Sequence, residues 1–126
     1  MKFKDWLRMR NACHESLEWL GDKTLQEAWE TCQRGDWMRW LSQAATKVVG
    51  CNWTWNKHDQ MCSAWTVFAK KEGIDAAYDE AIGKILLKNS LGNIKEEDEV
   101  WERYVSLQAS FFRSIQPTPP PIEGIS

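Results

Sequence analysis

Apolar residues recur at steps of three and four along most of the chain, and this spacing constrains the fold more than any other sequence feature. Such a period places apolar side chains on one face of an α-helix, which must be buried against another element. One stretch, residues 51–55, alternates aromatic and polar residues as a strand does, but no second strand is predicted to pair with it. The fold class is therefore predicted to be all-α.

Six helices are predicted, joined by turns of only a few residues. The first covers residues 4–20 and stops at Gly21, because glycine readily ends a helix. The others are marked by capping residues and glycines: a capping box of Thr24 and Glu27 with a stop at Gly35, a start at Asp36 with a stop at Gly50, a start near Asn56 with a stop at Gly73, a start at Asp75, and a run from Ile94 to Ile115. Helices of such unequal length indicate an irregular bundle.

A single helical domain is expected over residues 1–115, because 126 residues are enough for one core without disulfides or a structural metal. All 4 prolines lie in residues 116–126. Proline lacks the backbone N–H and clashes with a preceding helical turn. This tail is therefore predicted to be extended and flexible.

Composition excludes several classes of protein. The net charge of -2 argues against a general nucleic-acid coat, which needs a basic surplus to displace counterions from phosphates. No apolar run approaches the roughly 20 residues of a membrane span. The first residues hold no continuous apolar segment of the kind found in signal peptides, so a cytoplasmic location is expected. The 4 cysteines are accordingly expected to be reduced thiols.

Metal and catalytic motifs are weak. His58 and Cys62 lie four residues apart and share a helix face, with Cys51 as a conceivable third ligand, yet free cysteine more often packs as a small apolar residue. His14 and Glu18 have the spacing of an oriented general base and equally that of an ordinary surface pair. We therefore predict no enzyme activity and no cofactor, and leave a metal at His58 and Cys62 open.

Charge gathers at two places. The acidic cluster comprises Glu96, Glu97, Asp98, Glu99 and Glu102. It is suited to a basic partner, and it also fits the first turns of a helix, where the macrodipole favours negative charge.

The other charged segment is the basic start of the chain. It contains Lys2, Lys4, Arg8 and Arg10 against the single acid Asp5. A basic first turn opposes the helix dipole, so these residues are either a contact for nucleic acid or an acidic surface, or a solvated face.

The 9 tryptophans divide into two groups by their expected positions. Five are predicted to lie on inner helix faces: Trp29, Trp37, Trp40, Trp65 and Trp101. Trp53 and Trp55 fall two residues apart in a loop and form either an exposed pair that anchors a partner or a plug over the core. Trp6 and Trp19 are further candidates for exposure.

Residues 12–20, 28–32 and 35–41 carry a recognisable pattern, whose most specific part is Gly35-Asp36-Trp37-Met38-Arg39-Trp40-Leu41. This pattern resembles a motif of small uncharacterised proteins of bacteriophages and prophages. The resemblance implies an origin in a mobile element and assigns no activity or residue role. A DNA-binding helix-turn-helix is disfavoured, because the segment after the turn has too few polar side chains for a recognition helix.

These features together predict a small phage-type module that binds a protein and occupies a surface of a larger host macromolecule. A narrower version of this prediction is an inhibitor of a bacterial defence nuclease of the anti-CRISPR kind. Its partner is expected to be a host protein or ribonucleoprotein with a basic surface, contacted through the acidic cluster, Trp53 and Trp55. The alternative is an accessory protein that binds single-stranded nucleic acid through exposed tryptophans and Lys2, Lys4, Arg8 and Arg10.

Overall fold

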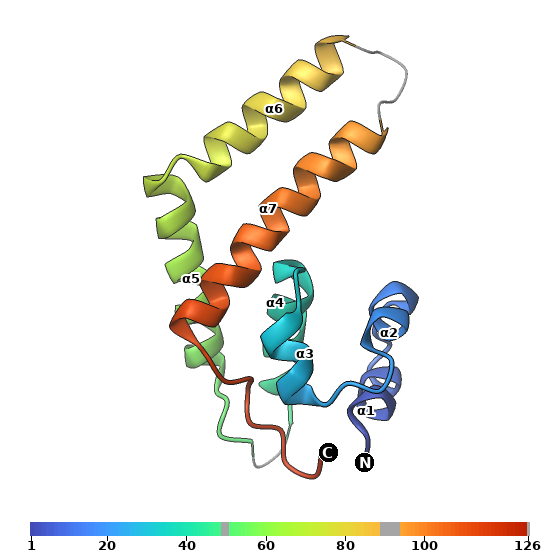
Figure 1. Ribbon diagram of the computed structural model, residues 1–126. Coiled ribbons are helices and arrows are strands. Elements are labelled where there is room, and N and C mark those ends of the chain that lie inside the picture. Colours follow the sequence, from blue (N-terminus) through green and yellow to red (C-terminus); the bar gives the residue numbers. More distant parts are fainter. Residues whose placement is uncertain (49–50, 89–93, 126) are drawn as a thin grey trace.

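The computed structural model describes residues 1–48, 51–88 and 94–125 of the chain. Over these residues seven helices pack into one body and no strand is present, so the all-α prediction is confirmed (Figure 1). The helices are α1 Phe3–Met9, α2 His14–Leu20, α3 Leu25–Thr31, α4 Gly35–Ala45, α5 Trp55–Lys71, α6 Ile74–Lys88 and α7 Ile94–Ile115. Within this part of the chain, no helix is long and apolar enough to cross a membrane.

The first predicted helix is wrong, because it is two helices, α1 and α2, separated by a turn. Asn11 has a φ of 58°, in the left-handed region. Its N–H donates to the Arg8 carbonyl at 3.1 Å, and the Ala12 N–H donates to the Leu7 carbonyl at 3.1 Å. This is the Schellman arrangement that ends a helix, with asparagine in the position that glycine usually takes. The break lets both short helices turn apolar side chains toward one core.

The capping box at the start of α3 is confirmed. Thr24 Oγ1 accepts the Glu27 N–H at 3.2 Å, and the Thr24 N–H donates to Glu27 Oε1 at 3.3 Å. The predicted end at Gly35 is wrong, because α3 stops at Thr31.

Gly35 begins α4, where the sequence pattern had placed Asp36 as the cap. A Cβ on Gly35 would lie 2.5 Å from Cβ of Gln108. Glycine is therefore required here by the close approach of α4 to α7, and not by a helix stop.

The three long helices pack closely on one another. α5 is capped by Thr54, whose Oγ1 accepts the Lys57 N–H at 3.3 Å, so the cap precedes the predicted Asn56. Gly73, with a φ of 71°, makes the sharp turn into α6. α6 and α7 then run antiparallel and project away from the shorter helices (Figure 1). The predicted stop at Gly50 lies outside the described residues.

The tryptophans are distributed differently from the prediction. Trp29 and Trp65 are buried as expected, and Trp37 is half-buried and packs against the core. Trp40 and Trp101 are each 37% exposed, so their assignment to the core is wrong. Trp6 and Trp53, both candidates for exposure, are buried. Helical periodicity identifies the inner face of a helix but not how much of that face a neighbour covers.

Residues 116–125 run back along the helices to a point near the N-terminus (Figure 1). Pro120 and Ile122 are buried. The Met1 ammonium donates to the Gly124 carbonyl at 2.9 Å, and Cys51 Sγ donates to the Pro121 carbonyl at 2.8 Å. The extended path agrees with the proline content of this segment. The flexibility of the segment stays a prediction, and the contacts of residues 120–124 argue against it.

Candidate functional site

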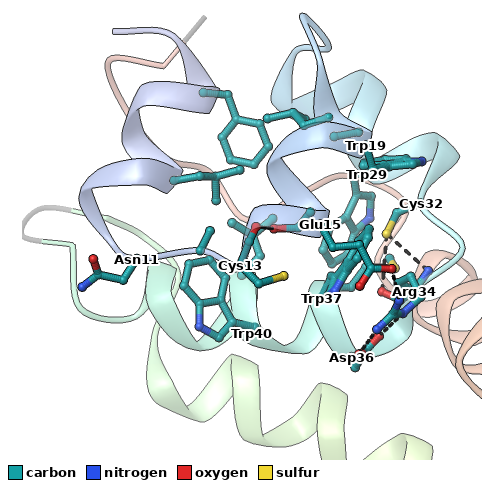
Figure 2. A pocket seen from close by; sticks show the side chains of 18 residues that line it. Asn11, Cys13, Glu15, Trp19, Trp29, Cys32, Arg34, Asp36, Trp37 and Trp40 are labelled. Atoms are coloured by element: carbon teal, nitrogen blue, oxygen red, sulfur yellow. Dashed lines mark hydrogen bonds and ion pairs between the residues drawn. The ribbon is translucent and has the colours of Figure 1, made fainter.

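A cavity of about 460 Å³ lies between the α1–α2 pair and α3–α4 (Figure 2). Much of its wall consists of buried apolar side chains: Phe3, Leu7, Leu20, Ala28, Trp29 and Met38. Close-packed interiors hold few voids larger than a water molecule, whereas small-molecule sites fall in the range of about 300–1,000 Å³. We call this hollow the apolar cavity.

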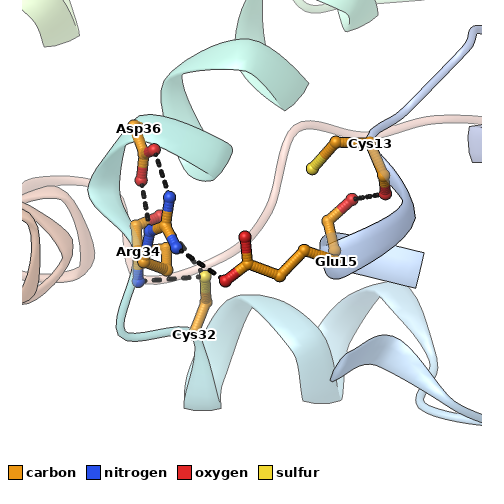
Figure 3. A network of polar contacts seen from close by, with 6 residues as sticks. Cys13, Glu15, Cys32, Arg34 and Asp36 are labelled. Atoms are coloured by element: carbon orange, nitrogen blue, oxygen red, sulfur yellow. Dashed lines mark hydrogen bonds and ion pairs between the residues drawn. The ribbon is translucent and has the colours of Figure 1, made fainter. Parts of the chain in front are cut away.

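Arg34 forms a polar network at the rim of the apolar cavity (Figure 3). Its Nε and Nη2 donate to the two carboxylate oxygens of Asp36 at 3.0 and 2.8 Å, and its Nη1 donates to Glu15 Oε1 at 3.2 Å. The hydrogen bonds that Arg34 donates to the Asp36 carboxylate raise the pKa of Arg34. The guanidinium therefore stays charged and joins α2 to the start of α4.

Two cysteines contribute to the wall of the apolar cavity. Cys32 is buried, and its Sγ accepts the Arg34 N–H at 3.4 Å. Burial raises the pKa of the Cys32 thiol. Cys13 reaches the cavity from the exposed start of α2. A protonated thiol is a poor nucleophile, so the environment of Cys32 suits packing better than covalent chemistry.

A second hollow of about 610 Å³ lies between the short helices and α7. Its walls carry three carboxylates, from Glu15, Glu99 and Glu102. The rings of Trp19 on α2 and Trp37 on α4 also line this hollow, and their centroids are 5.9 Å apart. The remaining lining residues are Gln33, Arg34, Arg103 and Ser106. We call this hollow the acidic groove.

Both tryptophans of the acidic groove already contact a cation of the same chain. The Arg34 guanidinium lies 4.4 Å from the ring centroid of Trp37, and Lys23 Nζ lies 4.7 Å from that of Trp19. Such contacts arise because the face of an indole ring is electronegative. These rings are thus placed where cations are stabilised.

The structure places the acidic cluster at the start of α7. Glu96, Asp98, Glu99 and Glu102 are exposed and Glu97 is half-buried. Glu99 and Glu102 line the acidic groove, one helical turn apart.

Trp53 and Trp55 do not form one surface. Trp53 is 4% exposed and donates its indole N–H to Ser42 Oγ at 2.9 Å, whereas Trp55 is 57% exposed in the first turn of α5. Trp53 therefore fills the core and is too buried to contact a partner. Trp55 remains available to a partner.

The basic start of the chain is partly engaged within the molecule. Arg8 pairs with Asp5 at 3.5 Å, and Arg10 lies 3.9 Å from the ring centroid of Trp6. Lys2 is exposed and Lys4 is half-buried. These side chains do not line either hollow.

The suggested catalytic and metal residues lie outside both hollows. His14 and Glu18 form an exposed ion pair with a 2.8 Å separation, which is the ordinary surface arrangement. His58 is buried, with Nδ1 2.7 Å from Ser42 Oγ and Nε2 3.7 Å from Cys62 Sγ.

The cluster of Ser42, His58 and Cys62 resembles a catalytic cysteine–histidine pair, but the pKa shifts favour the neutral forms of both side chains. Burial raises the pKa of the Cys62 thiol and lowers the pKa of His58. Ser42 is fully buried, where a substrate does not reach it. Cys51 is bonded to the Pro121 carbonyl, and over the described residues no three metal-ligating side chains gather.

Sequence reasoning named Trp19 as a candidate for exposure but missed that Trp37 lines the same groove, and it missed the role of Arg34. Trp19 was singled out for its position off the main helix stripe, and the Gly-Asp-Trp motif contains Trp37, but neither pattern reveals that α7 lies opposite them. The pairing depends on the packing of segments about 60 residues or more apart, which periodicity does not encode.

Comparison with known proteins gives no relative for this chain: no family model, no curated protein and no solved structure matches it. Its function is therefore inferred from the geometry of its own hollows.

Proposed function

We propose that this protein is a protein-binding module whose acidic groove receives a basic segment of a larger partner. The observation that carries the proposal is the position of Trp19 and Trp37 in a groove that also exposes the carboxylates of Glu99 and Glu102. An arginine or lysine side chain entering the groove would meet an aromatic face and a carboxylate together.

The charges of the acidic groove favour a cationic occupant. Three carboxylates face two guanidinium groups, and Arg34 already donates three hydrogen bonds to Glu15 and Asp36. Charge-assisted hydrogen bonds and cation–π contacts both strengthen when water is displaced, so a docked arginine gains from each. A phosphate group would be repelled by the same carboxylates.

The narrower hypothesis, an inhibitor of a bacterial defence nuclease, is one member of this class. It is supported by the acidic groove, which suits the basic channel of such an enzyme, and by the resemblance to phage proteins. The alternative of single-strand nucleic-acid binding is weakened because Trp53 is buried and Arg10 lies against Trp6.

The test is calorimetric titration of the protein with an oligoarginine peptide and with an oligoglutamate peptide. We expect saturable binding of oligoarginine only. The double variant Glu99→Gln/Glu102→Gln should weaken it about tenfold or more, which corresponds to about 1.4 kcal/mol.

A matched control is Glu72→Gln/Glu123→Gln, which removes the same charge from exposed residues outside the acidic groove. It should bind as the wild type does. An equal loss in both double variants would show that net charge alone attracts the peptide, and would overturn the groove as the site. Quenching of tryptophan fluorescence by a single-stranded oligonucleotide, lost at higher salt, would favour the nucleic-acid alternative instead.

A further inference from the structure

The function proposed above does not use the apolar cavity, which is partly open to solvent. Its volume of about 460 Å³ compares with about 30 Å³ for one water molecule in the liquid. Ordered water needs polar partners, and much of this wall is apolar. Binding sites for small molecules typically have this size and a mainly apolar and aromatic lining.

We propose that the apolar cavity is a binding site for a small aromatic molecule that carries no negative charge, of the class of neutral or cationic aromatic amines. The site is separate from the acidic groove, although the two share a wall formed by Glu15, Trp19, Arg34 and Trp37.

The shape of the ligand follows from the aromatic residues in the wall. Phe3, Trp29, Trp37 and Trp40 all line the cavity and are contributed by three different helices. Figure 2 shows the three tryptophans. Aromatic rings contact one another favourably in offset-stacked and edge-to-face arrangements. Rings presented from several sides therefore select a planar aromatic molecule over a flexible aliphatic chain.

The charge of the ligand follows from the rim. Among the described residues, Arg34 is the one cationic side chain that lines the cavity, and its Nε, Nη1 and Nη2 donate to Asp36 and Glu15. A ligand carboxylate, sulfonate or phosphate would find no uncommitted cation and would face two carboxylates. An amine would instead meet the exposed carboxylate of Glu15 at the mouth.

Access to the cavity is provided by exposed residues that also line it. Asn11, Cys13 and Glu15 are exposed, and Trp40 is partly so. Asn11, Cys13 and Glu15 lie on the turn before α2 and at its start, and Trp40 lies in the middle of α4 (Figure 2). A small molecule can therefore enter without the core opening.

The experiment uses two dyes that differ by one group, N-phenylnaphthylamine and its sulfonated analogue anilinonaphthalene sulfonate. Both fluoresce when they leave water for an apolar site. We expect saturable one-to-one binding of the neutral amine, and binding of the sulfonate at least tenfold weaker. Equal binding of the two dyes, or no saturation by the neutral one, would overturn the proposal.

A cavity-filling variant locates the site. Ala28 is buried and lines the cavity, so Ala28→Leu should weaken binding of N-phenylnaphthylamine at least tenfold while leaving the melting temperature unchanged or higher. The matched control is Ala77→Leu, on an exposed position of α6, which should bind as the wild type does. Should Ala28→Leu fail to fold, Ala12→Leu at the half-buried edge of the cavity replaces it.

Undiminished dye binding by the folded cavity-filling variant would place the dye elsewhere on the protein and overturn the inference. The Glu99→Gln/Glu102→Gln variant should keep full dye binding, because neither residue lines the apolar cavity. Dye binding and oligoarginine binding can therefore fail independently of each other.

Discussion

The two halves of the molecule build their cores from helices of very different length. The short-helix half, residues 1–48, has helices of 7, 7, 7 and 11 residues. The long-helix half, the described part of residues 51–125, has helices of 17, 15 and 22 residues. A helix of two turns is unstable alone, and most of its backbone polar groups lie near an end without an intrahelical partner.

The long-helix half supplies some of those missing partners. Arg113 on α7 donates to the backbone carbonyls of Trp29 and Cys32 at the end of α3. The Gln116 carbonyl accepts the indole N–H of Trp29 at 2.8 Å. The short helices are therefore held in place by side chains and backbone from beyond residue 110.

Packing differs between the halves as well. In the long-helix half, Trp65 has four aromatic neighbours, and its ring centroid lies 5.6 Å from that of Phe111 and 6.4 Å from that of Phe112. The short-helix half encloses the apolar cavity and contributes one wall of the acidic groove. The difference teaches that the short helices leave room for a cavity lined by their own half alone, whereas the acidic groove lies between the two halves.

The sharpest way to break this comparison is to remove one phenyl ring from each half. Phe112→Ala should lower the free energy of unfolding by about 3–5 kcal/mol, because the ring is fully buried and surrounded. Phe3→Ala should lower it less, because Phe3 already faces the apolar cavity and loses fewer contacts. Urea unfolding measures both values, and equal losses would mean that the cavity does not loosen the packing around Phe3.

The dependence of α3 on α7 is tested by Arg113→Met, which keeps much of the side chain and removes its donors. We expect a loss of about 1.5–3 kcal/mol, because charged donors to two backbone carbonyls are removed. Arg103→Met, at an exposed position of the same helix, is the control and should change stability by about 0.5 kcal/mol or less. Similar losses in the two variants would argue against the support of α3 by Arg113.

The junction between the halves is tested by a pair of glycine variants. Gly35→Ala should lower stability by about 1–3 kcal/mol, because the new Cβ would overlap Gln108. Gly83→Ala, in the interior of α6, should raise stability by about 0.5–1 kcal/mol, because a Cβ there meets no atom within 4 Å. Thermal unfolding measures both, and a stabilising Gly35→Ala would contradict the close approach of α4 and α7.

A smaller effect is expected from His58, which joins α4 to α5 through Ser42. Burial lowers the pKa of His58, Arg39 lowers it further, and Asp59 partly opposes this. The unfolded chain then binds a proton more readily than the folded one, so the contribution of His58 is complete above about pH 6.5 and is lost as the pH falls toward the lowered pKa. Urea unfolding at several pH values should show this loss in the wild type and in His14→Asn, but not in His58→Asn.

Local features of the fold could be predicted from the sequence because they depend on neighbours in the chain. The capping box of Thr24 and Glu27 was recognised because both partners lie within one helical turn. The break at Asn11 was missed because asparagine takes the left-handed conformation less often than glycine does, and so gives a weaker signal.

The candidate site was only partly predictable. The acidic cluster was identified from composition, and Glu99 and Glu102 do line a groove. Trp53 and Trp55 were treated as a pair, although one fills the core and the other is exposed. Spacing along a loop does not determine which of two aromatic residues a neighbouring helix will cover.

The sequence by itself determined that this chain is helical, where most of the helices lie, and which stretch of α7 is acidic, because periodicity, capping and charge act over a few residues. The tertiary structure alone decided that Gly35 serves a close contact, that Trp19 and Trp37 face Glu99 and Glu102, and that short helices enclose a cavity. Those properties depend on distances between segments remote in the chain, and such distances are set by how whole helices pack.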